Sequence, residues 1–413
     1  MTMKLARDGG TPVRTAPFPT WPVWDGVDEK AILEALRSGV WGRNTGSQVV
    51  AFEEEFAAFQ GTTYCIAVVN GTCALELGLR VLDVEFGDEV ICPSYTFVAT
   101  PAAPLFLGAI PVFADIDPDT FELDPISVEA AITPRTKAII PVHIAGQPPD
   151  MDGILAVAKQ HNLRVLEDAA QAHGASWRGQ GVGGVGDLGS FSFQSSKNLN
   201  CGEGGAICTN DQELAELTWS VMNVGRLREG AWYQHERLGW NYRLSEFHGA
   251  LLRAQLTRVP EQMELREANA HYLDTHLTQL PGITPQHRPA EVTGHAHHLY
   301  MLRYDKAAFG GNDRAAFIKA LSAEGIPCSP GYDWPCHEQN AVKNSVKEIL
   351  QKLDRTEDPL DRPLPVTDRI AHEEGVWLPQ SVLLADEKDM QQIVDAVAKV
   401  QRAFSMEREA ERV

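Results

Sequence analysis

Short apolar runs alternate with amphipathic stretches from about residue 64 to residue 209. Several of these runs are apolar at nearly every position, which is typical of parallel strands covered by helices on both faces. The stretches between them repeat apolar residues at helical spacing. We expect strands at 64–69, 88–94, 110–116, 137–144, 163–170, 188–194 and 204–209, and helices that include 72–82 and 151–162. This alternation predicts an α/β domain with three layers.

The pattern changes after Leu244. A helical pattern over 245–259 meets Pro260 and resumes over 261–280. Beyond it, an expected strand at 297–304 mixes with expected helices at 314–325 and 387–404. We therefore predict a large domain over residues 1–264, which includes the N-terminal segment, and a smaller α+β domain over 265–413. The charged and proline-rich stretch 338–368 is expected on the surface of the smaller domain.

Composition narrows the class of protein. The chain has 413 residues, and its formal net charge of −20 argues against a nucleic-acid partner or an anionic membrane surface. We see no secretory signal and no apolar run of the roughly 18 residues that span a bilayer. The seven cysteines form no C-x-x-C pair, so we expect free thiols in the cytoplasm.

Asn70-Gly71-Thr72 lies between an expected strand and an expected helix. A glycine and a hydroxyl at a helix start present free backbone N–H groups and the positive end of the helix dipole, which suits a phosphate. A simple capped helix after a tight turn explains the same residues.

Asp168 closes the apolar strand LRVLEDAA, and Lys197 follows the strand LGSFSFQ just before a glycine-rich turn. A carboxylate in a buried place needs a partner, which is either the next turn or a cationic ligand atom. A lysine in a desolvated pocket has a lowered pKa and can form a Schiff base with an aldehyde. An exposed loop lysine is the alternative.

Together these features are what pyridoxal phosphate requires: a phosphate cradle, an acid for the pyridine nitrogen and a Schiff-base lysine. The chain resembles the DegT/StrS family of pyridoxal-phosphate sugar aminotransferases, which have the fold-type-I architecture. The resemblance runs from about Pro17 to Phe404. Its motifs are NGTCALELGL, PSYTFVAT, EDAAQAHGA, GSFSFQSSKNLNCGEGGA and GWNYRLSEFHGA.

The resemblance implies roles at the reacting end of the cofactor. Lys197 is implied as the lysine that bonds the cofactor, and Asp168 as the partner that keeps the pyridine nitrogen protonated. Gln171 is implied near the ring hydroxyl. Because family members that act as 3-dehydrases carry His in place of this lysine, ordinary transamination is favoured.

The resemblance also implies how the rest of the cofactor is held. Gly71 and Thr72, with the Ser192 hydroxyl, are implied at the phosphate. Phe97 is implied as the aromatic stacked on the ring, with ordinary core packing as its alternative. Asn241 is implied to reach the phosphate of the neighbouring subunit, which makes the active unit a homodimer; a loop-capping amide is its alternative.

Within the family the chain most resembles the cyclitol branch, the glutamine:scyllo-inosose aminotransferases of aminoglycoside pathways. The phrases KLARDGGTPVRTAPFPTWP, IIPVHIAGQPPDMD and LRYDKAAFGG carry this resemblance. The chain is also similar to 3-amino-5-hydroxybenzoate synthases. Tyr332 and His337 lie where family members place a Tyr and a His near the acceptor, although the spacing departs from Y-x-P-x-H.

We therefore expect a pyridoxal-phosphate aminotransferase of antibiotic biosynthesis. It would move an amino group from L-glutamine or L-glutamate to the ketone of a cyclitol or sugar. The alternatives are a dehydratase like 3-amino-5-hydroxybenzoate synthase, a nucleotide-sugar aminotransferase, and a non-catalytic cofactor-bound sensor.

Two further patterns imitate binding motifs. Residues 181–186 read G-x-G-x-x-G, but they precede an expected strand instead of joining a strand to a helix, so we interpret them as a glycine-rich turn. His295, His297 and His298 form HAHH, which a strand would divide between two faces. We expect no metal site there.

Overall fold

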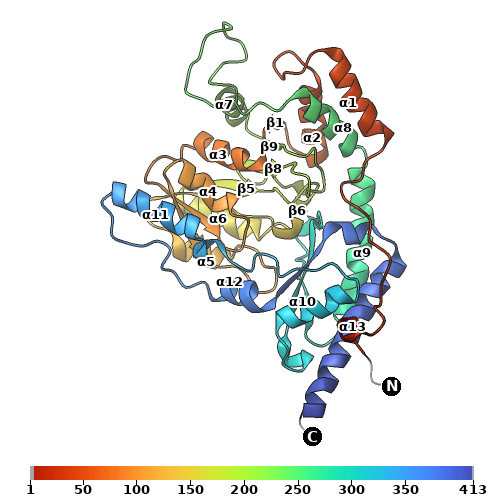
Figure 1. Cartoon of the computed structure of the whole chain (residues 1–413). Helices are drawn as coiled ribbons and strands as arrows, with labels where there is room; N and C mark the ends of the chain where they lie inside the picture. The colour runs from red at the N-terminus through yellow and green to blue at the C-terminus, as the bar shows by residue number, and fades with distance from the viewer. Residues whose placement is uncertain (1–3, 412–413) are drawn as a thin grey trace.

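The computed structural model describes residues 4–411, and its centre is a seven-stranded sheet (Figure 1). The strand order is β1-β9-β8-β5-β4-β2-β3, and β9 runs antiparallel to both of its neighbours. The strands are β1 (Tyr64–Val68), β2 (Glu89–Pro93), β3 (Ile110–Ala114), β4 (Thr136–Ile139), β5 (Arg164–Asp168), β8 (Leu188–Ser192) and β9 (Gly205–Thr209). All seven expected strands are confirmed, although β4 ends earlier than the pattern predicted.

Helices cover both faces of this sheet, so the strands are apolar on both sides. Ile66 and Val68 of β1 join one core with α3 (Gly71–Val81), α4 (Ala99–Phe106) and α7 (Gln212–Met222). Cys65 and Ala67 face the opposite way, toward α2 (Gln48–Gln60) and α8 (Glu246–Leu256). Farther along that same face lie α5 (Pro125–Ala131) and α6 (Met151–His161). The three-layer α/β/α arrangement is confirmed.

A second core surrounds a small antiparallel sheet of three strands, in the order β10-β12-β13. Its elements are α9 (Val259–Leu277), β10 (Ile283–Pro285), β12 (Leu299–Tyr304), α10 (Arg314–Ala323), β13 (Gly375–Pro379) and α13 (Glu387–Glu411). Pro260 lies in the first turn of α9, where its missing N–H costs no hydrogen bond. Leu5 packs in this second core, and the N-terminal chain runs beside α9 from α1 (Gly26–Ser38) (Figure 1).

The stretch 338–368 packs differently from the expectation. Its helix α11 (Asn340–Lys352) contacts α4 and β3, and its apolar side chains join the core of the large sheet. The reason is an apolar stripe with helical spacing, made by Val342, Val346, Ile349 and Leu350. Residues 340–352 lie within the predicted smaller domain but pack on the core of the large sheet. The domain boundary at residue 264 therefore stays a prediction.

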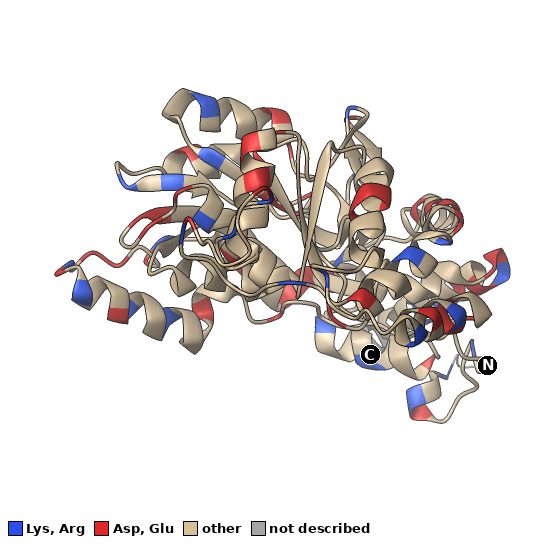
Figure 2. Cartoon of the chain, turned by 90° about the horizontal axis from the view of Figure 1, so that it is seen from above, with Lys and Arg blue, Asp and Glu red and all other residues tan. Residues whose placement is uncertain are grey.

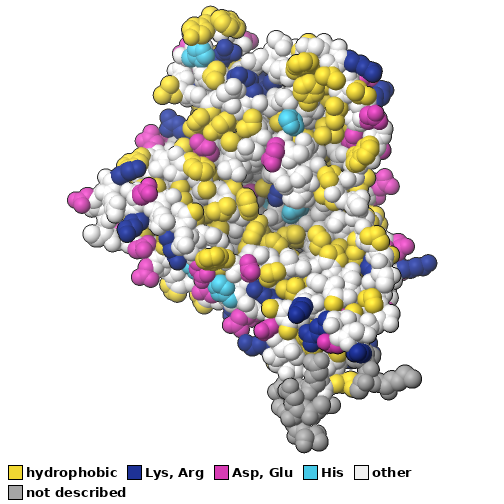
Figure 3. All heavy atoms as spheres, viewed as in Figure 1, with side chains coloured by type: hydrophobic (Ala, Val, Ile, Leu, Met, Phe, Trp, Pro, Cys, Tyr) yellow, Lys and Arg dark blue, Asp and Glu magenta, His cyan; other side chains and the backbone are white. Residues whose placement is uncertain are grey.

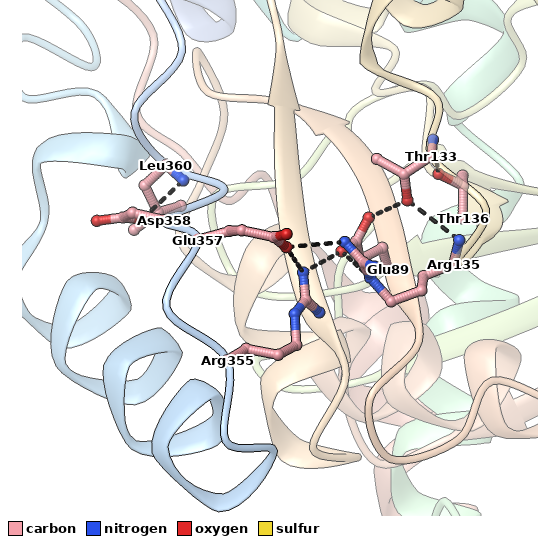
Figure 4. Close-up of polar contacts among 8 residues, drawn as sticks. All are labelled: Glu89, Thr133, Arg135, Thr136, Arg355, Glu357, Asp358 and Leu360. Carbon is pink, nitrogen blue, oxygen red and sulfur yellow. Dashed lines mark hydrogen bonds and ion pairs between the residues drawn. The ribbon is translucent and has the colours of Figure 1, made fainter.

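An ion-pair network fastens the end of this stretch to the large sheet (Figure 4). The Glu89 carboxylate accepts hydrogen bonds from Thr133 Oγ1 at 2.5 Å, Arg135 Nε at 2.9 Å and Arg355 Nη2 at 2.8 Å. Burial raises the pKa of Glu89, but these hydrogen bonds outweigh it and hold the pKa below its usual range.

Charged residues of both signs are spread over the outer helices and loops, and the central strands are largely free of them (Figure 2). Among the described residues, no helix combines the length and the apolar character that crossing a bilayer needs.

Candidate active site

Asp168 and Lys197 meet at the carboxyl edge of the large sheet, where open α/β sheets bind ligands. Asp168 is the last residue of β5 and is 6% exposed, and Lys197 lies in the loop between β8 and β9. Burial lowers the pKa of the Lys197 amine to about 8, against an opposing effect of the Asp168 charge. Its Nζ has no hydrogen bond or ion pair with any residue from 4 to 411.

The two carboxylate oxygens of Asp168 differ in how strongly they are hydrogen-bonded. The Thr100 hydroxyl donates to Oδ2 at 2.8 Å, whereas Oδ1 accepts only a long bond, 3.3 Å, from the Ala170 N–H. Burial raises the pKa of Asp168, and the bonds from Thr100 and Ala170 and the charge of Lys197 lower it in part. A carboxylate of this kind suits a protonated ring nitrogen.

The start of α3 forms a cradle with free N–H groups. The Asn70 side chain caps the helix by accepting from the Cys73 N–H at 2.8 Å. Within the described chain, the N–H groups of Gly71 and Thr72 have no partner, as at any helix start. A Cβ on Gly71 would lie 2.7 Å from Ser192 Cβ and 3.2 Å from its Oγ, so only glycine lets Ser192 approach the helix end. The cradle fits a phosphate.

Gln171 follows Asp168 by three residues, and both ends of its side-chain amide are hydrogen-bonded. Oε1 accepts from the Ala145 N–H at 2.8 Å, and Nε2 donates to the Tyr332 hydroxyl at 3.3 Å. Ala145 adopts a left-handed conformation with φ of 57°, which aims its N–H at the amide. The amide nitrogen retains a second hydrogen for a ligand. The structure therefore brings Tyr332 into contact with Gln171, and a role of Tyr332 toward the acceptor stays a prediction.

His337 lies apart from this group. Its Nδ1 is 2.8 Å from the Ser94 hydroxyl, and its Nε2 is 3.3 Å from Asp368 Oδ1 and 3.9 Å from Glu338 Oε1. No described contact joins it to Lys197 or Gln171. His337, Glu338 and Asp368 could each offer one atom to a metal ion, although ordinary ion pairs explain their contacts. A role for His337 toward an acceptor stays a prediction.

Phe97 and Asn241 are both free to meet other molecules. Phe97 is 56% exposed, so core packing does not explain it, and it precedes α4 at the site. The Asn241 side chain is exposed and has no hydrogen bond with any described residue, so it does not cap a loop. Asn241 ends the loop 223–241, which projects beyond α7 (Figure 1).

Three contacts of the site were missed by reading the sequence. Thr100 contacts Asp168, Thr96 contacts Thr100, and the Trp21 indole donates to the Ser195 carbonyl, at 3.0 Å, in the loop that carries Lys197. PSYTFVAT contains both threonines, but its spacing does not indicate which carboxylate they contact. No signal in the sequence points from residue 21 to residue 195.

The two segments that resemble binding motifs, residues 181–186 and 295–298, are hydrogen-bonded to other residues of the chain. The glycine-rich loop 181–186 binds the chain's own Glu167: the N–H groups of Gly183, Val185 and Gly186 donate to its carboxylate at 2.8, 2.9 and 2.7 Å. In HAHH, His297 Nε2 lies 2.7 Å from Glu267, and His298 Nδ1 lies 3.0 Å from Asn198.

Comparison with known proteins decides the family. A model described as the DegT/DnrJ/EryC1/StrS aminotransferase family matches residues 24–398. The chain belongs to this family. It is therefore an aminotransferase, and aminotransferases of this family depend on pyridoxal phosphate. The resemblance inferred from the motifs is confirmed.

Individual relatives match the DegT-family chain along nearly all its length. A Streptoalloteichus tenebrarius protein, provisionally named an L-glutamine:3-amino-2,3-dideoxy-scyllo-inosose aminotransferase, is 41% identical over 97% of this chain and 99% of its own. An L-glutamine:2-deoxy-scyllo-inosose aminotransferase of the same organism is 39% identical over 97% of this chain and 98% of its own.

A solved structure has the same fold. The crystal structure of 3-amino-5-hydroxybenzoic acid synthase superposes with a TM-score of 0.83 at 35% identity, covering 95% of this chain and 99% of that chain. The expected α/β fold of a pyridoxal-phosphate transferase is thereby confirmed.

Proposed function

We propose that this aminotransferase moves an amino group from L-glutamine or L-glutamate to the ketone of a cyclitol, with pyridoxal phosphate at the carboxyl edge of the large sheet. The observation that supports this proposal is the arrangement of three groups at that edge. A half-buried lysine amine with a pKa of about 8 lies beside a buried carboxylate, Asp168, and near a helix start with unpartnered N–H groups.

Each residue has a role that its surroundings support. Bound pyridoxal phosphate supplies an aldehyde and an electron-withdrawing ring. Gly71 and Thr72 N–H groups and the Ser192 hydroxyl would hold the phosphate, and Asp168 Oδ1 the ring nitrogen. The remaining Gln171 N–H would point at the ring hydroxyl, and the exposed Phe97 ring would cover one face.

Lys197 moves the proton. The amine is partly neutral near pH 8, so its Nζ can accept a proton from the donor Cα and return it to the reacting carbon. A group with a pKa near the working pH suits both directions of this transfer. A lysine at its ordinary pKa of about 10.4 would be almost entirely protonated and could not accept that proton.

The cyclitol acceptor is supported by the two inosose aminotransferases, which match over nearly the whole chain. The similarity to 3-amino-5-hydroxybenzoic acid synthase supports a dehydratase as the second candidate. In that case Lys197 would abstract a proton for an elimination on a carbocyclic substrate.

We also propose that the active unit is a homodimer. The loop 223–241 exposes Trp232, Tyr233 and Leu238 at 79%, 77% and 94%. Hydrophobic side chains gather at its tip on the surface (Figure 3). Large apolar groups so exposed on one projecting loop are typical of an interaction site. A second copy of the chain would cover them and bring the unpaired Asn241 amide to the partner's phosphate cradle.

The test is a spectral half-reaction of the cofactor-loaded protein with a panel of amino donors, followed by keto-cyclitols and nucleotide-linked keto-sugars. We expect turnover with glutamine or glutamate and amination of scyllo-inosose. Amination of nucleotide sugars alone would contradict the cyclitol acceptor. Elimination from aminodehydroshikimate without amination would favour the dehydratase. A Lys197→Ala protein that transaminates at the wild-type rate would overturn the assignment of the lysine.

A further inference from the structure

Two buried threonines form a chain of hydroxyl groups that ends on Asp168. Thr96 and Thr100 are 3% and 0% exposed, and both belong to the segment that leads from β2 into α4. Thr96 Oγ1 lies 2.9 Å from Thr100 Oγ1, and Thr100 Oγ1 lies 2.8 Å from Asp168 Oδ2. No part of the proposed reaction so far uses either hydroxyl.

The direction of this chain follows from counting protons. A hydroxyl has one proton to donate and two lone pairs that accept. Because Thr100 spends its proton on the Asp168 carboxylate, Thr96 must be the donor in the contact between the two threonines. Thr100 therefore accepts one hydrogen bond while it donates another, which polarises its O–H bond and strengthens the bond to the carboxylate.

We propose that Thr96 and Thr100 are positioning residues for transamination: their hydroxyl relay keeps Asp168 ionised and reserves its Oδ1 for the cofactor ring nitrogen. This inference rests on the proposed role of Asp168. Oδ2 already accepts a short bond from Thr100, whereas Oδ1 accepts only a long one, so Oδ1 has more capacity for a strong, charge-assisted bond. A donor on the carboxylate also favours the arrangement in which the shared proton stays on the ring nitrogen.

Other groups act on Asp168 as well. Lys197 and His143 lower its pKa through their charges, and the Cys92 thiol and the Tyr332 hydroxyl lie close enough to feel the carboxylate's charge. Thr100 differs from them because it contacts the carboxylate directly. Replacing it with valine keeps the branched shape and removes the hydroxyl that donates to Asp168 and accepts from Thr96.

The first experiment uses the cofactor-free protein, so that it does not depend on catalysis. The pKa of Asp168 is raised on folding, so its contribution to stability is fully present below its unfolded pKa and is lost as the pH rises through its folded pKa. Thr100→Val raises the folded pKa further. We expect the destabilisation of Thr100→Val relative to wild type to grow with pH, by about tenfold in the unfolding constant from pH 4 to pH 8.

Matched variants separate the relay from packing. Thr218 is also fully buried, but its hydroxyl donates to the Leu214 carbonyl within α7, so Thr218→Val should show a pH-independent difference. Thr100→Ser keeps the donor and should follow the wild-type pH dependence. In the Asp168→Asn background, Thr100→Val should lose its pH dependence.

The second experiment uses the loaded enzyme. We expect Thr100→Val to lower kcat of the donor half-reaction about tenfold with an unchanged KM, Thr96→Val to lower it less, and Thr100→Ser to restore it. A parallel pH dependence of Thr100→Val and wild type, with an unchanged kcat, would overturn the relay. Failure of wild type to load the cofactor would instead overturn the proposed function, so the two failures are distinguishable.

Discussion

A glycine-rich loop and a helix start of this protein each present backbone N–H groups to an anion, and they differ in where the anion comes from. The loop 181–186 spends three N–H groups on Glu167, which is fully buried in the sheet. The turn 70–72 leaves the N–H groups of Gly71 and Thr72 without a partner among residues 4–411, beside the Ser192 hydroxyl. The first turn stabilises the fold, whereas the second is available to a ligand.

The surroundings of the two turns explain the difference. Glu167 also lies 2.9 Å from His143 Nε2, so its oxygens are saturated by groups of the chain itself. No carboxylate of the described residues is hydrogen-bonded to the N–H groups of Gly71 and Thr72, and the carboxylate of Asp168 is engaged by Thr100. Removing the internal anion should therefore cost stability, and altering the open cradle should cost cofactor affinity.

The largest expected effect comes from Glu167→Ala. This change removes the acceptor of three N–H groups, one of them buried and two part-buried, and of His143, so we expect a loss of about 3–5 kcal/mol in the free energy of unfolding. Chemical denaturation of the cofactor-free protein measures it. Glu373→Ala, which breaks an exposed pair with Lys306, is the control and should cost less than about 1 kcal/mol. Equal losses in the two variants would break the comparison.

Gly71→Ala tests the open turn. Its Cβ would push Ser192 away from the helix start, so we expect cofactor affinity to fall by roughly 10- to 100-fold, about 1.4–2.7 kcal/mol. Equilibrium titration with pyridoxal phosphate measures the change. Gly26 is also the first residue of a capped helix but has open space at its Cβ, so Gly26→Ala should bind normally. Normal binding by Gly71→Ala would place the phosphate elsewhere.

Ser192→Ala sharpens the account of the cradle by removing one hydroxyl. A hydrogen bond to a charged group contributes about 1.5 kcal/mol or more, so we expect roughly tenfold weaker cofactor binding. At saturating cofactor the donor half-reaction should keep its rate. A slower half-reaction with unchanged affinity would move Ser192 from the phosphate to the reacting centre.

The smallest effect concerns pH. The pKa of Lys197 is lowered to about 8, so its neutral, nucleophilic fraction grows as the pH rises toward and past that value. The rate of cofactor capture should rise about fivefold from pH 7 to pH 8 and level off above pH 9. Stopped-flow absorbance measures this rate. A rise that continues unchanged to pH 10.5 would mean that the amine has its ordinary pKa.

Local patterns predicted most of the fold. Apolar runs such as YCIAVV and LRVLEDAA predicted the strands because both faces of the sheet are covered, and the turns after them predicted the cradle and Asp168. Lys197 followed from its position after a buried strand.

Contacts between distant segments could not be predicted. The charge and prolines of 338–368 predicted a surface stretch of the smaller domain, whereas the apolar stripe on α11 packs it on the core of the large sheet. The glycine-rich loop 181–186 was interpreted as a turn because it precedes a strand, yet no nearby residue indicated that Glu167 is the anion it binds. The contact of Thr100 with Asp168 could not be predicted either, because the two residues lie 68 positions apart in the sequence.

The most direct test of the central claim is to load the protein with pyridoxal phosphate, reduce it with borohydride, and map the modified peptide by mass spectrometry. We expect a single phosphopyridoxyl group on Lys197, a much lower yield in Gly71→Ala at limiting cofactor, and a normal yield in Gly26→Ala. A modification on another lysine, or equal yields in the two glycine variants, would contradict it.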